Sequence, residues 1–393
     1  MILRERVVAI PNTKMTRRCL DPWNYLEVNA SGLKPCCMIA PMAPFENSPA
    51  DLADARNCDA FVQLRRQLLS GDLAPQCQLC HIRPMTPVDT FQSLIRWKSR
   101  FARTKTPSLA LPLVTLRIEV TMKCNLRCVY CGVSQPHYVA SEMSKSYLMQ
   151  LVGKLTNLSR RTVVAVNGHG ETTYHPDWLV FCNEVVNLNF PTQITTNLAR
   201  LLTQEEAECL AKFKKIEISI DTVDAVQLRS IRRHVKLENV LDNIAALRHA
   251  ARRLKCAAPE IGISCVIYDA SFSKLAQLAE FCIANDIAFV TFWQLLKHQD
   301  VKDAANVYPV PSLSPTEIAE AVRCLEAAIG LLNRAGIQTT VAGDFLREWR
   351  AVAGAPVEKA RFGSAVRRVK TQLRRRNKRI GNSLQAAMAR LTT

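Results

Sequence analysis

The sequence lacks several features that would point to other classes of protein. No apolar run approaches the ~20 residues of a membrane-spanning helix, and the opening segment, MILRERVVAIPNTK, is too polar for a signal peptide. No internal repeat is visible. A hydrophobic content of 48% and a charged content of 22% exclude a fibre and a mostly disordered chain. These absences predict a globular protein, and we expect a cytoplasmic one.

Acidic residues are scarce relative to basic ones. The chain has 52 Lys+Arg against 34 Asp+Glu, a net charge of +18, which favours anionic partners. Residues 359–379 hold ten Lys/Arg and no acid. Apolar residues at helical spacing there predict a basic amphipathic helix for an anionic membrane surface or nucleic acid; a solvated or disordered tail is the alternative. A peripheral position at the membrane therefore stays open.

Cysteine, by contrast, is abundant and unevenly placed. The chain has 15, an odd number, and clustered cysteines in a reducing compartment usually bind metal or do redox work. Six others stand singly in apolar or helical contexts, where we expect them to pack as small hydrophobic side chains. These are Cys182, Cys209, Cys256, Cys265, Cys282 and Cys324.

From residue 113 onward, short β-rich runs alternate with segments of helical periodicity. Six such runs begin with VTLRIEV and end with IAFVTFW, and the segments between them have helical periodicity at 141–158, 176–188, 203–213, 224–254 and 271–285. This alternation predicts parallel βαβ units. Earlier in the chain, DPWNYLEVNASGLKPCC predicts a hairpin, and FVQLRRQLLSGDLAPQCQLC predicts a helix that leads into a Cys pair. We therefore predict an α/β fold: a partial (β/α)6 TIM-like barrel with a small N-terminal Cys-rich domain and a basic helical C-terminal tail. The expected divisions are 1–88 for the Cys-rich domain, 89–110 for a helical linker, 111–300 for the barrel, 301–355 for a helical extension and 356–393 for the tail.

Three cysteines follow the first of these strands in the segment EVTMKCNLRCVYCGVS. Cys124, Cys128 and Cys131 have the spacing C-x3-C-x2-C on a loop, and three thiolates leave one coordination position open, as a catalytic metal needs. A structural zinc site is the alternative, with His137 six residues further on.

The motif CNLRCVYC, with Tyr130 as its aromatic residue, resembles the signature of the radical S-adenosylmethionine (SAM) superfamily. The resemblance implies a 4Fe–4S cluster on the three thiolates, SAM bound to it, and a reductant such as flavodoxin or ferredoxin. It also implies that SAM cleavage yields a 5′-deoxyadenosyl radical, which takes hydrogen from a substrate.

Later strand ends resemble the same family, in order. The turns VNGHGE, ITTN and EISID follow the second, third and fourth runs. We expect the glycines to let the backbone approach the methionine part of SAM, Glu171 to accept from its ammonium group and Val266 to flank adenine. The residues that the resemblance assigns to SAM are Tyr130, Gly168, Gly170, Glu171, Thr196, Asn197, Ser219, Asp221 and Arg232.

The cysteines of the first 80 residues have a pattern of their own. Their spacing resembles the SPASM/twitch module, although that module usually follows the barrel. The resemblance implies one auxiliary 4Fe–4S cluster for electron transfer, with Cys58 as a spare; a zinc ribbon is the alternative. The expected ligands are Cys19, Cys37 (or Cys36), Cys77 and Cys80.

These features predict a radical SAM oxidoreductase, isomerase or transferase acting on a small polar substrate, such as a sugar or phosphorylated metabolite. A peptide maturase and an RNA-modifying enzyme are alternatives, as is a non-catalytic zinc- or cluster-bearing scaffold for nucleic acid or membrane. The residue that ends the substrate radical is not identified; candidates near strand ends are Trp293, Gln294, His169 and His298.

Overall fold

The computed structural model describes residues 13–45, 52–80, 82–101, 111–296 and 307–354. The basic tail at 356–393 and His298 therefore lie outside the described residues. Residues 1–353 form one compact unit. Among the described helices, none combines the length and the apolar character needed to cross a bilayer.

One sheet of nine strands organises this unit, in the order β13-β12-β11-β9-β8-β7-β5-β2-β3. All neighbouring strands are parallel except β2 and β3. The six expected strands are all present, and the fold is mixed α/β as predicted. They are β5 (Thr115–Ile118), β7 (Val163–Ala165), β8 (Thr192–Thr196), β9 (Lys215–Ser219), β11 (Glu260–Ile267) and β12 (Phe289–Gln294).

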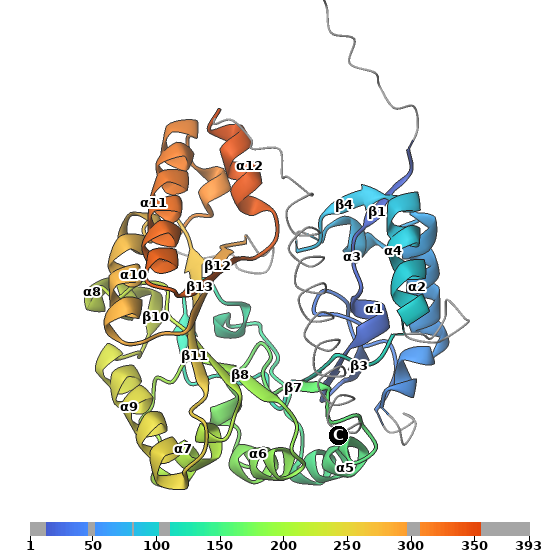
Figure 1. Ribbon diagram of the computed structural model, residues 1–393, viewed down its shortest axis with the longest axis horizontal. Helices are drawn as coiled ribbons and strands as arrows, with labels where there is room; N and C mark the ends of the chain where they lie inside the picture. The colour runs from blue at the N-terminus through green and yellow to red at the C-terminus, as the bar shows by residue number, and fades with distance from the viewer. Residues whose placement is uncertain (1–12, 46–51, 81, 102–110, 297–306, 355–393) are drawn as a thin grey trace, which may run out of the picture. The chain divides into compact units, whose positions relative to one another are not determined.

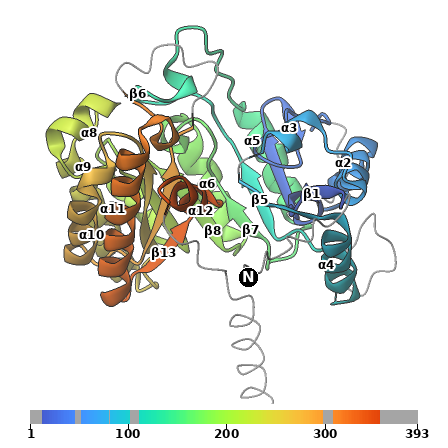
Figure 2. The ribbon, with the colours of Figure 1, turned by 90° about the horizontal axis from the view of Figure 1, so that it is seen from above.

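Helices connect these strands and lie along one face of the sheet (Figures 1 and 2). The segment expected as one helix over 224–254 is two helices, because β10 (Arg232–Arg233) interrupts it. The helices are α5 (Lys145–Leu155), α6 (Trp178–Asn187), α7 (Gln204–Ala211), α8 (Ala225–Ile231), α9 (Leu237–Leu254), α10 (Leu275–Ala284), α11 (Pro315–Arg334) and α12 (Phe345–Val352). The strand β13 (Gln338–Val341) follows α11 and extends the sheet beside β12.

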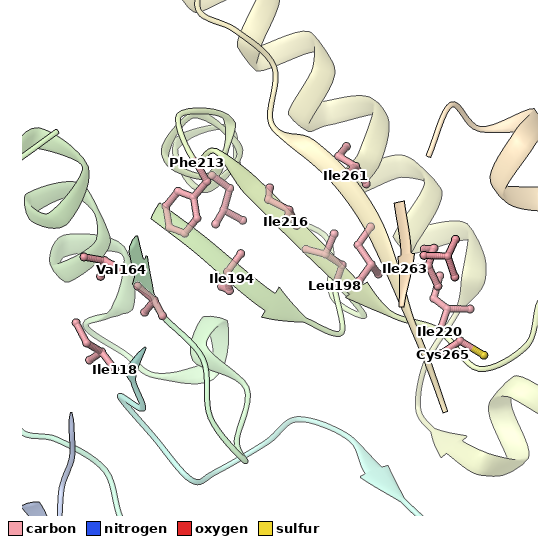
Figure 3. Close-up of a cluster of buried hydrophobic side chains, with 14 of the residues drawn as sticks. Ile118, Val164, Ile194, Leu198, Phe213, Ile216, Ile220, Ile261, Ile263 and Cys265 are labelled. Carbon is pink, nitrogen blue, oxygen red and sulfur yellow. The ribbon is translucent and has the colours of Figure 1, made fainter. Parts of the chain in front are cut away.

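The main core lies between these helices and the sheet. Figure 3 shows apolar side chains from five neighbouring strands, among them Ile118, Val164, Ile194, Ile216 and Ile263, gathered in this layer. Successive residues of a strand point to opposite faces, so Lys215, Glu217 and Ser219 of β9 alternate with its buried isoleucines and are only half-buried. The sheet thus keeps polar side chains on the face away from the core.

The N-terminal segment joins this sheet directly. The hairpin expected in DPWNYLEVNASGLKPCC is present as β2 (Tyr25–Asn29) and β3 (Gly32–Lys34), and β2 pairs in parallel with β5. The N-terminal hairpin and the later strands therefore share one sheet. The physical reason is burial: Leu26 and Val28 belong to the same apolar core as the barrel strands.

The remaining N-terminal elements surround the hairpin. The helix expected before the Cys pair is α2 (Asp59–Ser70), and the short α3 (Pro75–Gln78) carries Cys77. The expected linker helix is α4 (Val88–Phe101). The others are β1 (Met15–Arg17), which pairs with β4 (Met85–Pro87), α1 (Asp21–Asn24) and the 3-10 turn η1 (Asp54–Asn57).

Candidate functional site

The three cysteines of the C-x3-C-x2-C motif lie on the loop that follows β5. Cys128 belongs to the short strand β6 (Arg127–Cys128), which pairs with β10 so that Cys128 faces Arg232. Cys124 accepts a hydrogen bond at Sγ from the Leu126 backbone N–H at 3.4 Å. The loop is thus fixed to a segment one hundred residues later in the chain.

The three thiols act on one another electrostatically. Burial, followed by the charges of neighbouring groups, raises the pKa of Cys124 to about 11 and that of Cys128 to about 12. Cys131 contributes to both shifts, and Arg232 works in the opposite direction at Cys128 and Cys131. Three converging thiols beside a buried cation are a donor set that fits a metal cluster, which requires thiolates.

Glu171 is the centre of a buried polar group at the ends of β7 and β8. Its Oε1 accepts from the backbone N–H and the hydroxyl of Thr173 at 3.2 and 2.9 Å, and from the Thr196 hydroxyl at 2.8 Å. Its Oε2 accepts from the Asn197 backbone N–H at 2.7 Å. Oε2 thus has one protein donor against three at Oε1, and it retains room for a further donor.

Asn197 connects this group with the cysteine loop. Its Nδ2 donates to Asn125 Oδ1 at 2.8 Å and lies 3.8 Å from Cys124 Sγ. Asn243 of α9 holds the segment that follows, accepting from Leu202 and donating to the carbonyls of Leu198 and Arg200. The position of Asn197 beside the thiol is therefore determined by two other elements.

The two glycines of the VNGHGE turn lie in close contact with the segment after β5. A Cβ on Gly168 would lie 2.1 Å from Glu119 Oε1, and one on Gly170 would lie 2.3 Å from the Thr121 carbonyl oxygen. Their lack of a side chain therefore allows the turn to pack against that segment.

Asp221, Arg232 and Tyr130 form a second buried polar group. Arg232 donates from Nε and Nη2 to both carboxylate oxygens of Asp221 at 2.9 and 2.8 Å. Tyr130 donates to Oδ2 at 2.6 Å, and the Val266 backbone N–H donates to Oδ1 at 3.1 Å. Arg232, expected near a carboxylate of the ligand, thus binds a carboxylate of the protein itself, and Asp221 has all four lone pairs used.

A cavity of about 470 Å³ opens beside the cysteine loop. That volume lies within the range of small-molecule sites. The candidate radical-quenching residues His169 and Gln294 reach it, as does Val266. Its full lining is Tyr130, Cys131, Gly132, Val133, His137, Tyr138, Val139, His169, Val266, Gln294, Leu295 and Leu296.

A second cavity, of about 200 Å³, gathers the N-terminal cysteines. All four expected ligands line it, as does Cys36, whereas Cys58 does not. Trp293 of β12 also reaches this cavity, while its neighbour Gln294 reaches the larger one. The cysteines that line it are Cys19, Cys36, Cys37, Cys77 and Cys80.

No disulfide is formed, and all 15 cysteines are free. Cys182, Cys209, Cys265 and Cys282 are buried as expected, but Cys256 is exposed at the end of α9 and Cys324 is half-buried on α11. Within the described ranges, no three His, Cys, Asp or Glu side chains could hold a single metal ion. A cubane cluster asks for a different arrangement, since each of its thiolates binds a separate iron.

Several residues of these sites were missed by sequence reasoning. Arg117 and Glu119 of VTLRIEV reach the N-terminal cavity and the VNGHGE turn, respectively. Charged residues that alternate with apolar ones in VTLRIEV were a usable signal. Asn243 lies in the middle of a helical segment, and no sequence signal marked it.

The comparisons with known proteins bear on the larger site. Residues 118–257 match the family model described as Radical SAM superfamily. A cofactor-modifying protein for a tungsten-containing aldehyde ferredoxin oxidoreductase, from Pyrococcus furiosus, is 24% identical over 170 residues, 43% of this chain and 48% of that protein. A GTP 3′,8-cyclase from Marinobacter nauticus is 29% identical over 141 residues, 35% of this chain and 42% of that protein.

The chain thus spans less than half the length of these two relatives. Among solved structures, Streptococcus suis SuiB bound to S-adenosylmethionine is similar, with a TM-score of 0.48 and 17% identity over 82% of this chain and 72% of that one.

Proposed function

We propose that this chain, whose residues 118–257 form a radical SAM domain, is an enzyme that cleaves SAM reductively and takes hydrogen from a small polar substrate. The observation that carries the proposal is the position of Cys131, which belongs to the C-x3-C-x2-C loop and also lines the cavity of about 470 Å³. A cluster held by that loop would face the space in which SAM and substrate meet.

When bound, the cluster would pass one electron from an external reductant to SAM, and the cleaved SAM would then supply the group that removes a hydrogen atom from the substrate. The protein's own part is to bind and orient. Cys124, Cys128 and Cys131 would hold the cluster, and the buried Arg232 guanidinium would counteract negative charge at Cys128 and Cys131. Glu171 Oε2 has room for an ammonium donor, and Tyr130, held by Asp221, shapes the cavity wall.

The substrate class is inferred from the lining. His137, Tyr138, His169 and Gln294 give the cavity polar walls, while Val266 and the leucines exclude water. Such a lining suits a small polar molecule, and the GTP 3′,8-cyclases among the relatives make a phosphorylated one the first to try. No comparison favours a sugar.

We further propose that the N-terminal cysteines hold an auxiliary 4Fe–4S cluster for electron transfer. Four ligands are needed for a saturated cluster, and five cysteines line the cavity. Cys37 is the better fourth ligand, because Arg117 counteracts the effect of burial on its pKa. At Cys36 burial, with smaller contributions from Cys37 and Asp21, raises the pKa to about 12 against the lowering effect of the Met38 and Ile39 backbone hydrogen bonds.

Iron analysis and SAM cleavage test the proposal together. Anaerobic reconstitution should give about eight irons and eight sulfides per chain, since each of two cubanes has four. Dithionite-reduced protein should convert SAM to 5′-deoxyadenosine. A triple Cys124, Cys128 and Cys131→Ala variant should keep about four irons and lose all SAM cleavage.

Variants of the N-terminal cysteines separate the two sites. Cys37→Ser should lose about four irons and still cleave SAM, whereas the matched Cys36→Ser and Cys58→Ser should keep both clusters. A colourless protein with stoichiometric zinc would refute the proposal that this chain is a SAM-cleaving enzyme. An equal iron content in Cys36→Ser and Cys37→Ser would refute the ligand assignment alone.

A further inference from the structure

Three arginines line the cavity that holds the N-terminal cysteines, each from a different element. Arg17 comes from β1, Arg83 from the loop before β4, and Arg117 from β5 of the radical SAM domain's sheet. Four thiolates around a cluster carry a net negative charge, and guanidinium groups in the same cavity can offset it. One of the three guanidinium groups, that of Arg117, thus comes from outside the N-terminal elements.

Two of the arginines are committed within the N-terminal segment. Arg17 donates to the backbone carbonyls of Cys77, Gln78 and Arg83, and so fixes the loop that carries the C-x2-C pair. Arg83 forms an ion pair with Asp21, in which its Nη2 donates to both carboxylate oxygens at 2.7 and 2.8 Å. The charge of Arg83 is therefore largely offset by a carboxylate before any cluster is considered.

Arg117 is held differently. Its Nε donates to the Asn167 carbonyl at 2.9 Å, and its Nη1 lies 3.9 Å from Glu27 Oε2. Glu27 is already engaged, because the buried Lys34 ammonium donates to its Oε1 at 2.7 Å and the Tyr25 hydroxyl donates to its Oε2 at 2.8 Å. One carboxylate is thus shared by two cations, and a positive charge remains on the side facing the cavity.

Asn167 gives this guanidinium a second connection. It immediately precedes the Gly168–Glu171 turn, whose His169 backbone N–H donates to Glu119 and whose Glu171 accepts from Thr196 and Asn197. Arg117 therefore reaches the N-terminal cysteine cavity and the turn beside the larger cavity at the same time. Arg117 lines the smaller cavity, and its Nε also donates to the Asn167 carbonyl just before that turn.

We propose that Arg117 is a positioning residue that stabilises the charge of the auxiliary cluster from the barrel side and raises its reduction potential. The inference rests on the proposed function of the N-terminal cysteines as a cluster site. A nearby positive charge favours the reduced, more negative state of a cluster, since net charge and hydrogen bonds determine cluster potentials. An auxiliary cluster that accepts electrons needs its potential raised in this way.

A redox titration followed by electron paramagnetic resonance tests the inference on the full-length, reconstituted protein. Arg117→Gln removes the charge and keeps a polar side chain, so one of the two cluster signals should shift to a lower potential. Arg117→Lys keeps the charge and should remain near the wild-type value. Arg248→Gln is the matched control, because Arg248 donates to the Asn285 and Asp286 carbonyls and lines neither cavity; both potentials should be unchanged.

The outcomes separate this inference from the proposed function. A wild-type protein with one cluster would refute the auxiliary cluster itself. Two clusters with unchanged potentials in Arg117→Gln would overturn the role of Arg117 and leave the clusters standing. If Arg117→Gln fails to load the second cluster, Arg117→Lys decides. If Arg117→Lys binds the second cluster and has the wild-type reduction potential, the role of the positive charge is supported. If Arg117→Lys also lacks the second cluster, or shows the same shift in potential as Arg117→Gln, that role is refuted.

Discussion

At the scale of single residues, the two glycines of the VNGHGE turn show how closely the sites are packed. Gly170 lies against backbone atoms of Thr121 and Lys123, which cannot move aside as a flexible side chain can. The Glu171 backbone N–H also donates to the Lys123 carbonyl at 2.8 Å. The turn and the cysteine loop therefore hold each other in place, and any added atom at this contact should disturb both.

Gly170→Ala tests that contact. Its Cβ would lie 2.3 Å from the Thr121 carbonyl oxygen, so we expect a loss of about 1–3 kcal/mol in the free energy of unfolding. The measurement is urea denaturation followed by circular dichroism, together with iron content after reconstitution.

Gly153→Ala provides the matched control. Gly153 lies within α5 with nothing within 4 Å of its added Cβ, and alanine there should stabilise the protein by about 0.5–1 kcal/mol. Equal effects of the two substitutions would contradict the packing role assigned to Gly170.

The ion pair of Asp221 and Arg232 is the other feature of this scale. Both side chains are buried, and a buried pair gains from its geometry only when the remaining hydrogen-bonding capacity is also used. Tyr130 and the Val266 backbone meet that condition at Asp221. The pair thereby holds the Arg232 guanidinium in place near Cys128 and Cys131, where it opposes the effect of burial on the pKa of both thiols.

At the scale of elements, the starts of α7 and α11 are strongly specified. Both α7 and α11 begin with a complete capping box, formed by Thr203 with Glu206 and by Ser314 with Glu317. Each box satisfies two backbone N–H groups that a helix start leaves unpaired. Glu206 has an additional role, because Arg200 donates to both of its oxygens at 2.7 and 2.6 Å.

The stability of α7 should depend on pH through Glu206. Burial raises the pKa of Glu206, but the Arg200 and Thr203 donors outweigh it and leave the pKa below its usual value of 4.5. A carboxylate with a lowered pKa stabilises the folded state above its unfolded pKa, and this contribution is lost as the pH falls through the folded pKa. The relevant window therefore lies below pH 4.5.

Two substitutions measure this contribution. Glu206→Ala removes cap and charge and should cost about 1–2 kcal/mol at pH 7. Glu206→Gln keeps the cap and should cost below about 1 kcal/mol. Thermal unfolding from pH 7 to pH 3 should show the Gln variant converging on the wild type as the pH falls; a constant difference would exclude the ionic contribution.

At the scale of the whole molecule, the N-terminal hairpin and the barrel share a core. Leu26 and Val28 of β2 pack in the same cluster as Leu116 and Ile118 of β5. Removing the hairpin would expose apolar surface at about 25 cal/mol per Å² and leave the β5 edge unpaired. The barrel and the N-terminal cysteines should therefore fold as one cooperative unit.

Two truncations test this cooperativity. A fragment of residues 111–354 should lose the cooperative urea transition of the full chain or aggregate, whereas a fragment of residues 1–354 should keep it, since the compact unit extends to Ala353. The measurement is the slope and midpoint of the transition. A shorter fragment with an unchanged transition would establish an independent barrel domain.

Features that depend on neighbouring residues could be predicted from the amino-acid sequence. The six barrel strands, most of their helices, the hairpin at residues 25–34 and the C-x3-C-x2-C loop could be predicted, because side-chain periodicity and turn residues act over a few positions. The gathering of the N-terminal cysteines was predicted from their spacing, and they line one cavity.

The contacts between distant segments became known from the three-dimensional fold alone. It placed β2 beside β5, Arg232 opposite Cys128 and Arg117 between the two cavities. In this fold Gly168 and Gly170 pack closely against other parts of the protein. The strand β10 separates α8 from α9 at residue 232. The physical reason is that such pairings depend on which faces bury each other, and many pairings satisfy the same local pattern until the core is assembled.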